Sequence, residues 1–453
     1  MPPLPEKCPP GPTPRELLPQ IRRIQKDALG FLLDLSAQYG DLAFFPVASL
    51  PVYVASHPDG IKHVLQDQHR RYSKDTVQYN ALSTITGRGL LTSDGPLWLR
   101  QRRLAQPAFA RPRLMDLDRI IVPATQAMLE RWQEPARQGQ PVDLDAEMMR
   151  LTLEIVGKAL FSIDLSHETG RLTGAVLTTL DHIVHRVRHI IVPPDFVPTP
   201  RNLRFRRALR TLDETVYGLI ATRLQSGQPG DDLLGMLLKA RDEETGEPMS
   251  QRQVRDEIMT MLIAGHETVA SALTWTWYLL SSHPLVRQKM RTEVTGHLGG
   301  RLPASSDLAA LPYTAQVFSE ALRLYPPAWV ITRRAIEPDE LMGFPIPAGA
   351  MVIISPYVVH RRPDVWQTPD LFLPERFEPE SEGKRHRFSY LPFGGGPRLC
   401  IGSGFASLEA HLIMAMITQH FWLELAPHAQ VKVDALVTLR PQEGLPMLIR
   451  PYE

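Results

Sequence analysis

Residues 393–402 read FGGGPRLCIG, and apolar side chains at helical spacing follow at Phe405, Leu408 and Ile413. A thiol just before a helix lies near the positive end of the helix dipole and near unpaired backbone N–H groups. Both lower the pKa of the thiol and favour the thiolate that a metal requires. The glycines permit a tight turn beneath the sulfur, and Phe393 is placed to screen it from water. The stretch therefore predicts that Cys400 is a metal ligand.

Other uses of a glycine-rich run with a cysteine fit less well. A dinucleotide loop needs a third glycine where Leu399 stands, and a phosphate loop needs a Gly-Lys-Ser/Thr run that does not follow. A zinc site lacks a second cysteine nearby. A nucleophilic cysteine paired with a distant histidine, or a structural buried cysteine, stays open on this motif alone.

A second informative segment spans residues 258–280, which are almost wholly apolar and long enough to cross a bilayer. His266 and Glu267 stand at its centre, where a single membrane span would give them no partner helix. We therefore expect a long helix buried in a globular core. On such a helix the Thr268 hydroxyl can donate to the carbonyl of Ala264, and this bond beside a glycine bends the helix locally.

Composition sets the broad class of the protein. The 453 residues are 43% hydrophobic, and 50 Lys and Arg against 49 Asp and Glu give no reason to expect a nucleic-acid partner. Two cysteines exclude a disulfide framework, and the charged, Pro-rich lead of residues 1–20 resembles neither a secretory signal nor a membrane anchor. We expect a cytoplasmic protein with one domain over residues 1–453 and, with only 53 residues after Cys400, no fused reductase.

The pattern of the chain predicts a mainly α fold with a minor β region. Residues 43–54 favour a small sheet, residues 98–298 a helical array, and residues 312–324 a helix that stops before Pro326 and Pro327. Short strands are expected at residues 344–347 and 352–355.

Together the run around Cys400 and the segment around Glu267 resemble the cytochrome P450 family of heme-thiolate monooxygenases. The resemblance implies a triangular helical prism around one buried heme b, with the Cys400 thiolate as the axial ligand that favours O–O cleavage of bound dioxygen. For the propionates it implies cationic and indole partners, with Arg333 preferred over Arg334. The cofactor-binding residues so implied are Trp98, Arg102, Arg333, Phe393, Arg398 and Cys400.

The resemblance also implies roles for two side-chain groups. Glu267 and Thr268 match the acid and alcohol that deliver protons to the distal oxygen, and they are the predicted catalytic residues. Glu320, Arg323 and Arg376 match a network of charge-assisted hydrogen bonds, to which we assign a structural role in fixing the heme loop.

The implied partners are dioxygen, a hydrophobic small molecule, and a ferredoxin with its reductase as electron donors. Basic residues near Trp98 and before the heme loop would suit an acidic electron donor. We expect a monomer. The predicted substrate-pocket residues are Tyr79, Leu82, Leu90, Ala264, Ala328, Trp329, Val330 and Leu439.

A closer resemblance bears on the substrate. Segments 78–79, 81–83, 86–92, 264–275, 325–329, 355–357 and 438–441 look like a bacterial branch that hydroxylates carotenoid rings, whereas segments 193–202 and 227–250 depart from it. We therefore expect hydroxylation of a carotenoid β-ring, with fatty acids or terpenoids as alternatives; Arg88 or Tyr79 would anchor a fatty acid. A peroxide-driven peroxygenase and a non-catalytic heme sensor are alternatives of another class, and neither needs the pair Glu267 and Thr268.

Overall fold

The computed structural model describes residues 7–47, 50–163, 169–189, 192–228, 230–242 and 246–452, and most of them lie in helices. The helices are α1 (Pro14–Lys26), α2 (Ala28–Tyr39), α3 (Pro58–Lys62), α4 (Val77–Thr86), α5 (Gly95–Ala105), α6 (Arg111–Met115), α7 (Asp118–Gln138), α8 (Leu144–Phe161), α9 (Thr169–Arg188), α10 (Pro200–Gln225), α11 (Leu233–Lys239), α12 (Gln251–Ser282), α13 (Pro284–Leu298), α14 (Pro312–Leu324), α15 (Pro356–Val359), α16 (Pro379–Glu382) and α17 (Ser403–His420). The prediction of a mainly α fold is confirmed.

The strands form small sheets. They are β1 (Leu42–Val47), β2 (Leu50–Ala55), β3 (Tyr72–Ser73), β4 (Pro141–Asp143), β5 (Ile331–Ala335), β6 (Asp339–Leu341), β7 (Phe344–Ile346), β8 (Met351–Ile354), β9 (Phe421–Leu425), β10 (Val433–Ala435), β11 (Leu439–Pro441) and β12 (Pro446–Pro451). The largest sheet has the order β1-β2-β8-β5-β3, in which only β2 and β8 are parallel. The smaller sheets are β4-β12-β9, β10-β11 and β6-β7. The expected strands near residues 43–54, 344–347 and 352–355 are all present.

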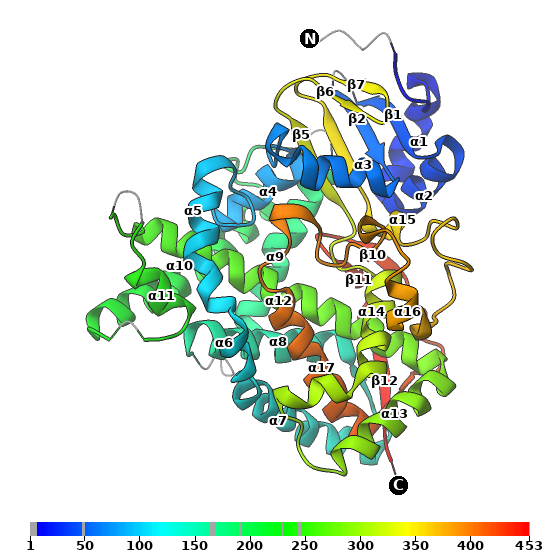
Figure 1. Cartoon of the computed structure of the whole chain (residues 1–453). Coiled ribbons are helices and arrows are strands. Elements are labelled where there is room, and N and C mark those ends of the chain that lie inside the picture. Colours follow the sequence, from blue (N-terminus) through cyan, green and yellow to red (C-terminus); the bar gives the residue numbers. More distant parts are fainter. Residues whose placement is uncertain are drawn as a thin grey trace.

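Figure 1 shows how these layers are arranged. The N-terminal helices and the sheet of β1, β2 and β5 form one corner of the molecule, while α4 to α14, α16 and α17 lie outside that corner. Within the described ranges, none of the helices combines the length and apolarity that a membrane crossing requires.

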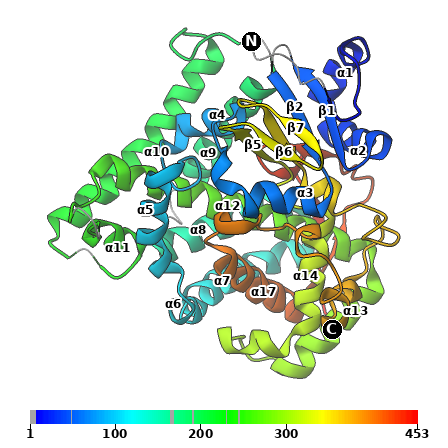
Figure 2. The same cartoon turned by 45° about the horizontal axis from the view of Figure 1, so that its top comes forward.

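Helix α12 is the centre of the helical part. The Ser250 hydroxyl caps it by accepting from the backbone N–H of Gln253, and α8, α10, α14 and α17 all pack against it. The expected buried helix over residues 258–280 is thus confirmed as part of α12. Figures 1 and 2 both show the segment that leads into α17 beside the middle of α12. The Cys400 segment and the Glu267 segment are therefore brought to one region by tertiary packing.

Candidate functional site

The Cys400 loop is a tight turn that leads into α17. The backbone N–H of Cys400 donates to the carbonyl of Phe393 at 3.0 Å, which closes the loop. Gly394 and Gly396 have φ values of 75° and 67°, in the left-handed region that favours glycine. A Cβ on Gly396 would lie 1.9 Å from the carbonyl oxygen of Leu65, so only glycine fits there. The predicted role of these glycines in a tight turn is confirmed.

The Cys400 side chain lies deep in the protein and yet faces open space. Part of its surface is accessible to solvent, although burial raises the pKa of its thiol. The backbone N–H of Gly402 and the charges of Arg102 and Lys74 lower that pKa, but burial outweighs them. The expectation of a lowered thiol pKa is therefore wrong for the protein atoms alone, because the pattern of a loop before a helix does not reveal the depth of burial.

The face of α12 toward this region is also open. Nearly every residue from Val254 to Leu280 is buried, but Ala264, Gly265 and Thr268 are partly exposed on one face of the helix. Exposure at the centre of an otherwise buried helix, together with the exposure of Cys400, indicates a hollow between α12 and the loop. Across the described ranges, no cluster of three or more His, Cys, Asp or Glu side chains could hold a metal ion. A metal on Cys400 therefore needs a ligand set that the protein does not supply, as a porphyrin would.

Cationic side chains gather around the hollow. Arg333 on β5 is 7% exposed, and its guanidinium donates to the backbone carbonyl of Thr332 at 2.9 Å. Arg334, on the opposite face of the strand, is exposed and pairs with Asp75 at 2.9 Å. Arg102 on α5 donates to the carbonyl of Leu399 at 2.9 Å, next to Cys400.

Arg398 completes this group from the loop side. Its guanidinium lies 4.2 Å from the ring centroid of Trp98 and pairs with Asp94 at 2.5 Å. Trp98 and Arg102 lie on the same helix, α5, as the sequence predicts.

Lys74 was not found by sequence analysis. It is 8% exposed, and its ammonium donates to the carbonyl of Leu91 at 2.7 Å. Burial, and then the charges of Arg333 and Arg398, hold the pKa of the Lys74 ammonium well below its usual range. Asp94 is the carboxylate that opposes these cations, so the group carries excess buried positive charge, which fits a ligand with carboxylates of its own. In the sequence, a single lysine between a serine and an aspartate does not indicate that its side chain will be buried near Cys400.

The middle of α12 presents the predicted acid and alcohol. The Thr268 hydroxyl donates to the Ala264 carbonyl at 2.7 Å, which confirms the predicted hydrogen bond. Glu267 is 2% exposed, and burial raises its pKa to about 7. The Thr438 hydroxyl donates to Glu267 Oε1 at 2.9 Å, and the charge of Arg440 acts to lower the pKa of the carboxyl. Glu267 is therefore poised to gain or lose a proton near neutral pH.

The structure brings Glu320, Arg323 and Arg376 together. Arg323 Nε lies 2.6 Å from Glu320 Oε2, and Arg376 Nε lies 3.3 Å from Glu320 Oε1. Glu320 also accepts from the backbone N–H of Leu373 at 2.9 Å. The network joins α14 to the segment before the Cys400 loop, which is consistent with the predicted structural role.

The predicted pocket residues differ in their surroundings. Leu82, Leu90 and Leu439 are buried, Trp329 and Val330 are half-buried, and Ala328 is exposed. Tyr79 is buried against Lys74, whose Nζ lies 4.9 Å from the ring centroid. The structure thus places Tyr79 beside the cationic group.

Comparisons with known proteins agree with this geometry. A family model described as Cytochrome P450 matches residues 9–445. The chain is 38% identical to Cyclooctatin synthase of Streptomyces melanosporofaciens, 35% identical to Protein LUTEIN DEFICIENT 5, chloroplastic, of Arabidopsis thaliana, and 31% identical to Carotene epsilon-monooxygenase, chloroplastic, of the same plant. These matches cover 92%, 92% and 91% of this chain and 89%, 73% and 80% of the relatives. The crystal structure of the cytochrome P450DA heme domain superposes with a TM-score of 0.88 at 27% identity, over 98% of each chain.

Proposed function

The chain belongs to the cytochrome P450 family of heme-dependent monooxygenases, and we propose that it hydroxylates the ring of a carotenoid with Cys400 as the iron ligand. Heme iron with a thiolate ligand activates dioxygen for insertion of one oxygen atom into an unactivated C–H bond. The observation that carries the substrate proposal is that three distant segments, each of which resembles carotenoid hydroxylases, pack against one another beside Glu267.

The residues of the hollow fit heme. Cys400 offers one sulfur from a loop in which Gly396 admits no side chain, and Phe393 stands at the start of that loop. Lys74 and Arg333 are buried cationic side chains and Arg102 is a partly buried one, and the two propionates of heme would neutralise their charge. We assign Arg333 to this role in place of Arg334, because Arg334 is exposed and already paired with Asp75.

Glu267 and Thr268 are the proposed proton donors. A carboxyl that titrates near neutral pH can give up a proton during turnover and regain it before the next cycle. The Thr268 hydroxyl donates its hydrogen bond to the Ala264 carbonyl, so the lone pairs of its oxygen are left to face the partly exposed side of α12. There the hydroxyl can accept from water and hold it in the path of proton transfer.

The segments that resemble carotenoid hydroxylases converge in the structure. The Trp275 ring stacks on Tyr325 with a centroid distance of 4.2 Å and an interplanar angle of 6°. The Ser271 hydroxyl and the Trp275 indole both donate to the Leu439 carbonyl, at 2.6 and 2.9 Å. Segments 264–275, 325–329 and 438–441 thus fix one another around the turn that holds Glu267. Shared residues at a packed junction support a shared pocket shape better than scattered surface identities would.

The pocket candidates favour a hydrocarbon over a fatty acid. Leu82, Leu90 and Leu439 offer no charge. The expected anchors for a carboxylate are poorly placed, because Arg88 is exposed and Tyr79 lies against Lys74. One relative is named a carotene monooxygenase, which agrees with a carotenoid.

A terpenoid is the second candidate. The relative with 38% identity is named Cyclooctatin synthase, and an apolar pocket suits a terpenoid equally well. Electrons would come from a ferredoxin and its reductase, and Arg103, Arg111 and Lys384 are exposed basic residues near α5 and before the Cys400 loop that suit an acidic donor.

Product analysis of the reconstituted enzyme tests this proposal. The heme-loaded protein, a ferredoxin, its reductase and NADPH are incubated separately with β-carotene, a cyclic diterpene hydrocarbon and laurate. We expect hydroxylated β-carotene as the main product. Turnover of the diterpene or laurate without any hydroxylated carotenoid would refute the substrate. Lack of the far-red Soret band of the reduced carbon monoxide complex would refute Cys400 ligation.

A further inference from the structure

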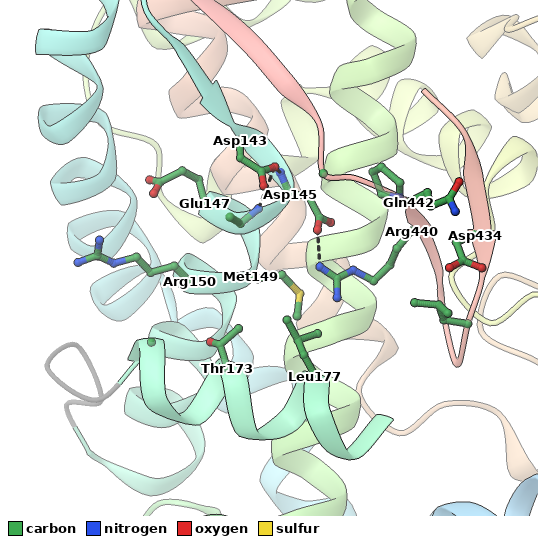
Figure 3. Close-up of a pocket in the computed structure, with 15 residues that line it drawn as sticks. Asp143, Asp145, Glu147, Met149, Arg150, Thr173, Leu177, Asp434, Arg440 and Gln442 are labelled. Carbon is green, nitrogen blue, oxygen red and sulfur yellow. Dashed lines mark hydrogen bonds and ion pairs between the residues drawn. The ribbon is translucent and has the colours of Figure 1, made fainter. Parts of the chain in front are cut away.

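A surface pocket lies between α8, α9 and the β10–β11 hairpin. It has a volume of about 700 Å³ and is lined by the start of α8, by α9, and by β10 and β11. Figure 3 shows Asp145 and Arg440 joined across it by an ion pair, with Thr173 and Leu177 of α9 on the facing wall. None of the residues that line this pocket has a role in the proposed binding of heme or substrate.

Buried polar atoms at this pocket lack protein partners. Within the described residues, Asp145 Oδ1, Arg440 Nε and Thr173 Oγ1 are buried without a hydrogen-bond partner. The Thr274 hydroxyl lies close enough to lower the pKa of Asp145, but it donates its proton to the Ala270 carbonyl at 2.8 Å. Buried polar groups in native proteins are nearly always satisfied, by water where protein atoms are missing. The pocket is therefore built to hold ordered water.

The acids of the pocket are not free to bind a cation. Asp143 Oδ1 accepts from the backbone N–H groups of Asp145 and Leu445, at 3.1 and 2.9 Å. Glu147 accepts from the Trp132 indole at 3.1 Å. Asp145 is paired with Arg440, so each of these three carboxylates already has a partner within the protein.

The segment that carries Arg440 connects the pocket lining to Glu267. Thr438, which donates to Glu267 Oε1, stands two residues before Arg440 on the same segment. Arg440 and Asp145 are the charged groups that act on the pKa of Glu267, Arg440 by lowering it and Asp145 by raising it. The neighbouring His266 is neutral at pH 7, because burial lowers its pKa to about 3.

We propose that this pocket is the proton entrance of the enzyme, in which water reaches the Asp145–Arg440 pair and the Thr438 hydroxyl relays protons to Glu267. The inference rests on the proposed role of Glu267 as a proton donor. The Thr438 hydroxyl donates to Glu267, and water that enters beside Arg440, two residues further on, would donate to the Thr438 oxygen, so a proton moves inward along the chain as each bond exchanges. Every proton that Glu267 gives up is replaced by one from bulk solvent. Asp145 and Arg440 act as positioning residues.

Infrared titration of Glu267 in the ferric, heme-loaded enzyme tests the coupling. The band of the protonated carboxyl is identified by its loss in Glu267→Gln. We expect Arg440→Gln to move its midpoint to higher pH and Asp145→Asn to move it to lower pH, each by about one pH unit. A purely structural pair would shift both variants in the same direction or neither.

The matched control is a second ion pair with similar burial. Arg223 and Asp232 are 2.7 Å apart, with side chains 16% and 4% exposed, against 12% and 5% for Arg440 and Asp145. Arg223→Gln and Asp232→Asn should leave the midpoint of Glu267 unchanged. Equal shifts in the control variants would overturn the assigned coupling.

A steric plug tests the entrance itself. Thr173→Trp fills the pocket without removing either member of the ion pair, and Thr178→Trp on the same helix is the control outside the pocket lining. After rapid mixing with D₂O, we expect hydrogen exchange of the Glu267 carboxyl to slow at least tenfold in the plug variant only. Exchange as fast as in the wild type would overturn the proposal. Because this readout needs no substrate, it stands apart from the carotenoid test: failure to hydroxylate β-carotene refutes the substrate but not the entrance.

Discussion

Replacing Arg323 by Met should strongly destabilise the protein, because Arg323 is fully buried and saturated with hydrogen bonds. Its side chain donates to both carboxylate oxygens of Glu320, at 2.6 and 2.8 Å. It also donates to the carbonyls of His360, Pro369 and Leu371, at 2.8, 2.7 and 3.0 Å. Methionine fills similar space but leaves a buried carboxylate and three carbonyls without these donors.

The size of the effect follows from the burial of both partners, whose side chains are 0% exposed. Removing one member of a buried ion pair costs roughly 3–5 kcal/mol, a large part of the 5–15 kcal/mol typical of whole proteins. Each orphaned carbonyl adds about 1 kcal/mol or more. Arg376, 3.3 Å from Glu320, offsets only part of this loss.

Urea unfolding of the heme-loaded protein, followed by loss of the Soret band, measures the effect. We expect Arg323→Met to lower the midpoint by about 1 M, which is a loss of ~3–5 kcal/mol divided by a slope somewhat above the ~3 kcal/mol per M of small proteins. Heme content on purification should fall as well. The double variant Glu320→Leu with Arg323→Met removes both charges and should be less destabilised than the single one. A single variant within 0.2 M (about 0.6 kcal/mol) of the wild type, or a double variant that is worse, would refute the reasoning.

Further predictions concern the site itself. Thr268→Ala should keep heme binding but divert reducing equivalents to peroxide or water, measured as peroxide formed per NADPH oxidised; wild-type coupling would contradict the relay. The folded pKa of Glu267, about 7, exceeds the ordinary 4.5, so the wild type loses stability as the pH rises from 5 to 8. The variant Glu267→Gln has no carboxyl to ionise, so over this range its stability should rise by about 3 kcal/mol relative to that of the wild type. Equal pH profiles in thermal unfolding would count against the raised pKa. Lys74→Met should stabilise the heme-free protein, because it relieves repulsion with Arg333, and should weaken heme retention about tenfold, measured as transfer of heme to apomyoglobin. A variant whose stability and heme retention change in the same direction would contradict this role of Lys74. Gly396→Ala should abolish heme incorporation, because its Cβ would overlap the Leu65 carbonyl; normal heme content would exclude that clash.

Local chemistry explains why much of the site was predictable. The Cys400 loop depends on glycines in the left-handed region of φ and on a helix that starts three residues later. Both features are set by a few neighbouring residues in the sequence. The α12 segment was predictable for a similar reason. A long apolar run indicates a buried helix, and the four-residue spacing of Thr268 from Ala264 predicts their hydrogen bond. The resemblance then supplied roles that spacing alone left open, above all for Arg323 and Glu320.

Other features exist only because distant segments meet. Strand alternation puts Arg333 and Arg334 on opposite faces of β5, but the packing of the sheet decides that Arg333 is the buried one. Lys74 joins the cations around Cys400, although the two residues are 326 positions apart in the sequence.

By itself, the sequence determined the mainly α fold, the tight glycine turn that carries Cys400, and the placing of an acid beside an alcohol on a buried helix, since these follow from local turns and helical spacing. The tertiary structure alone decided how deeply Cys400 is buried, which cations surround it, and that Arg440 meets Asp145 across 295 positions behind Glu267. Burial and charge pairing are sums over neighbours in space, and no short stretch of chain records them.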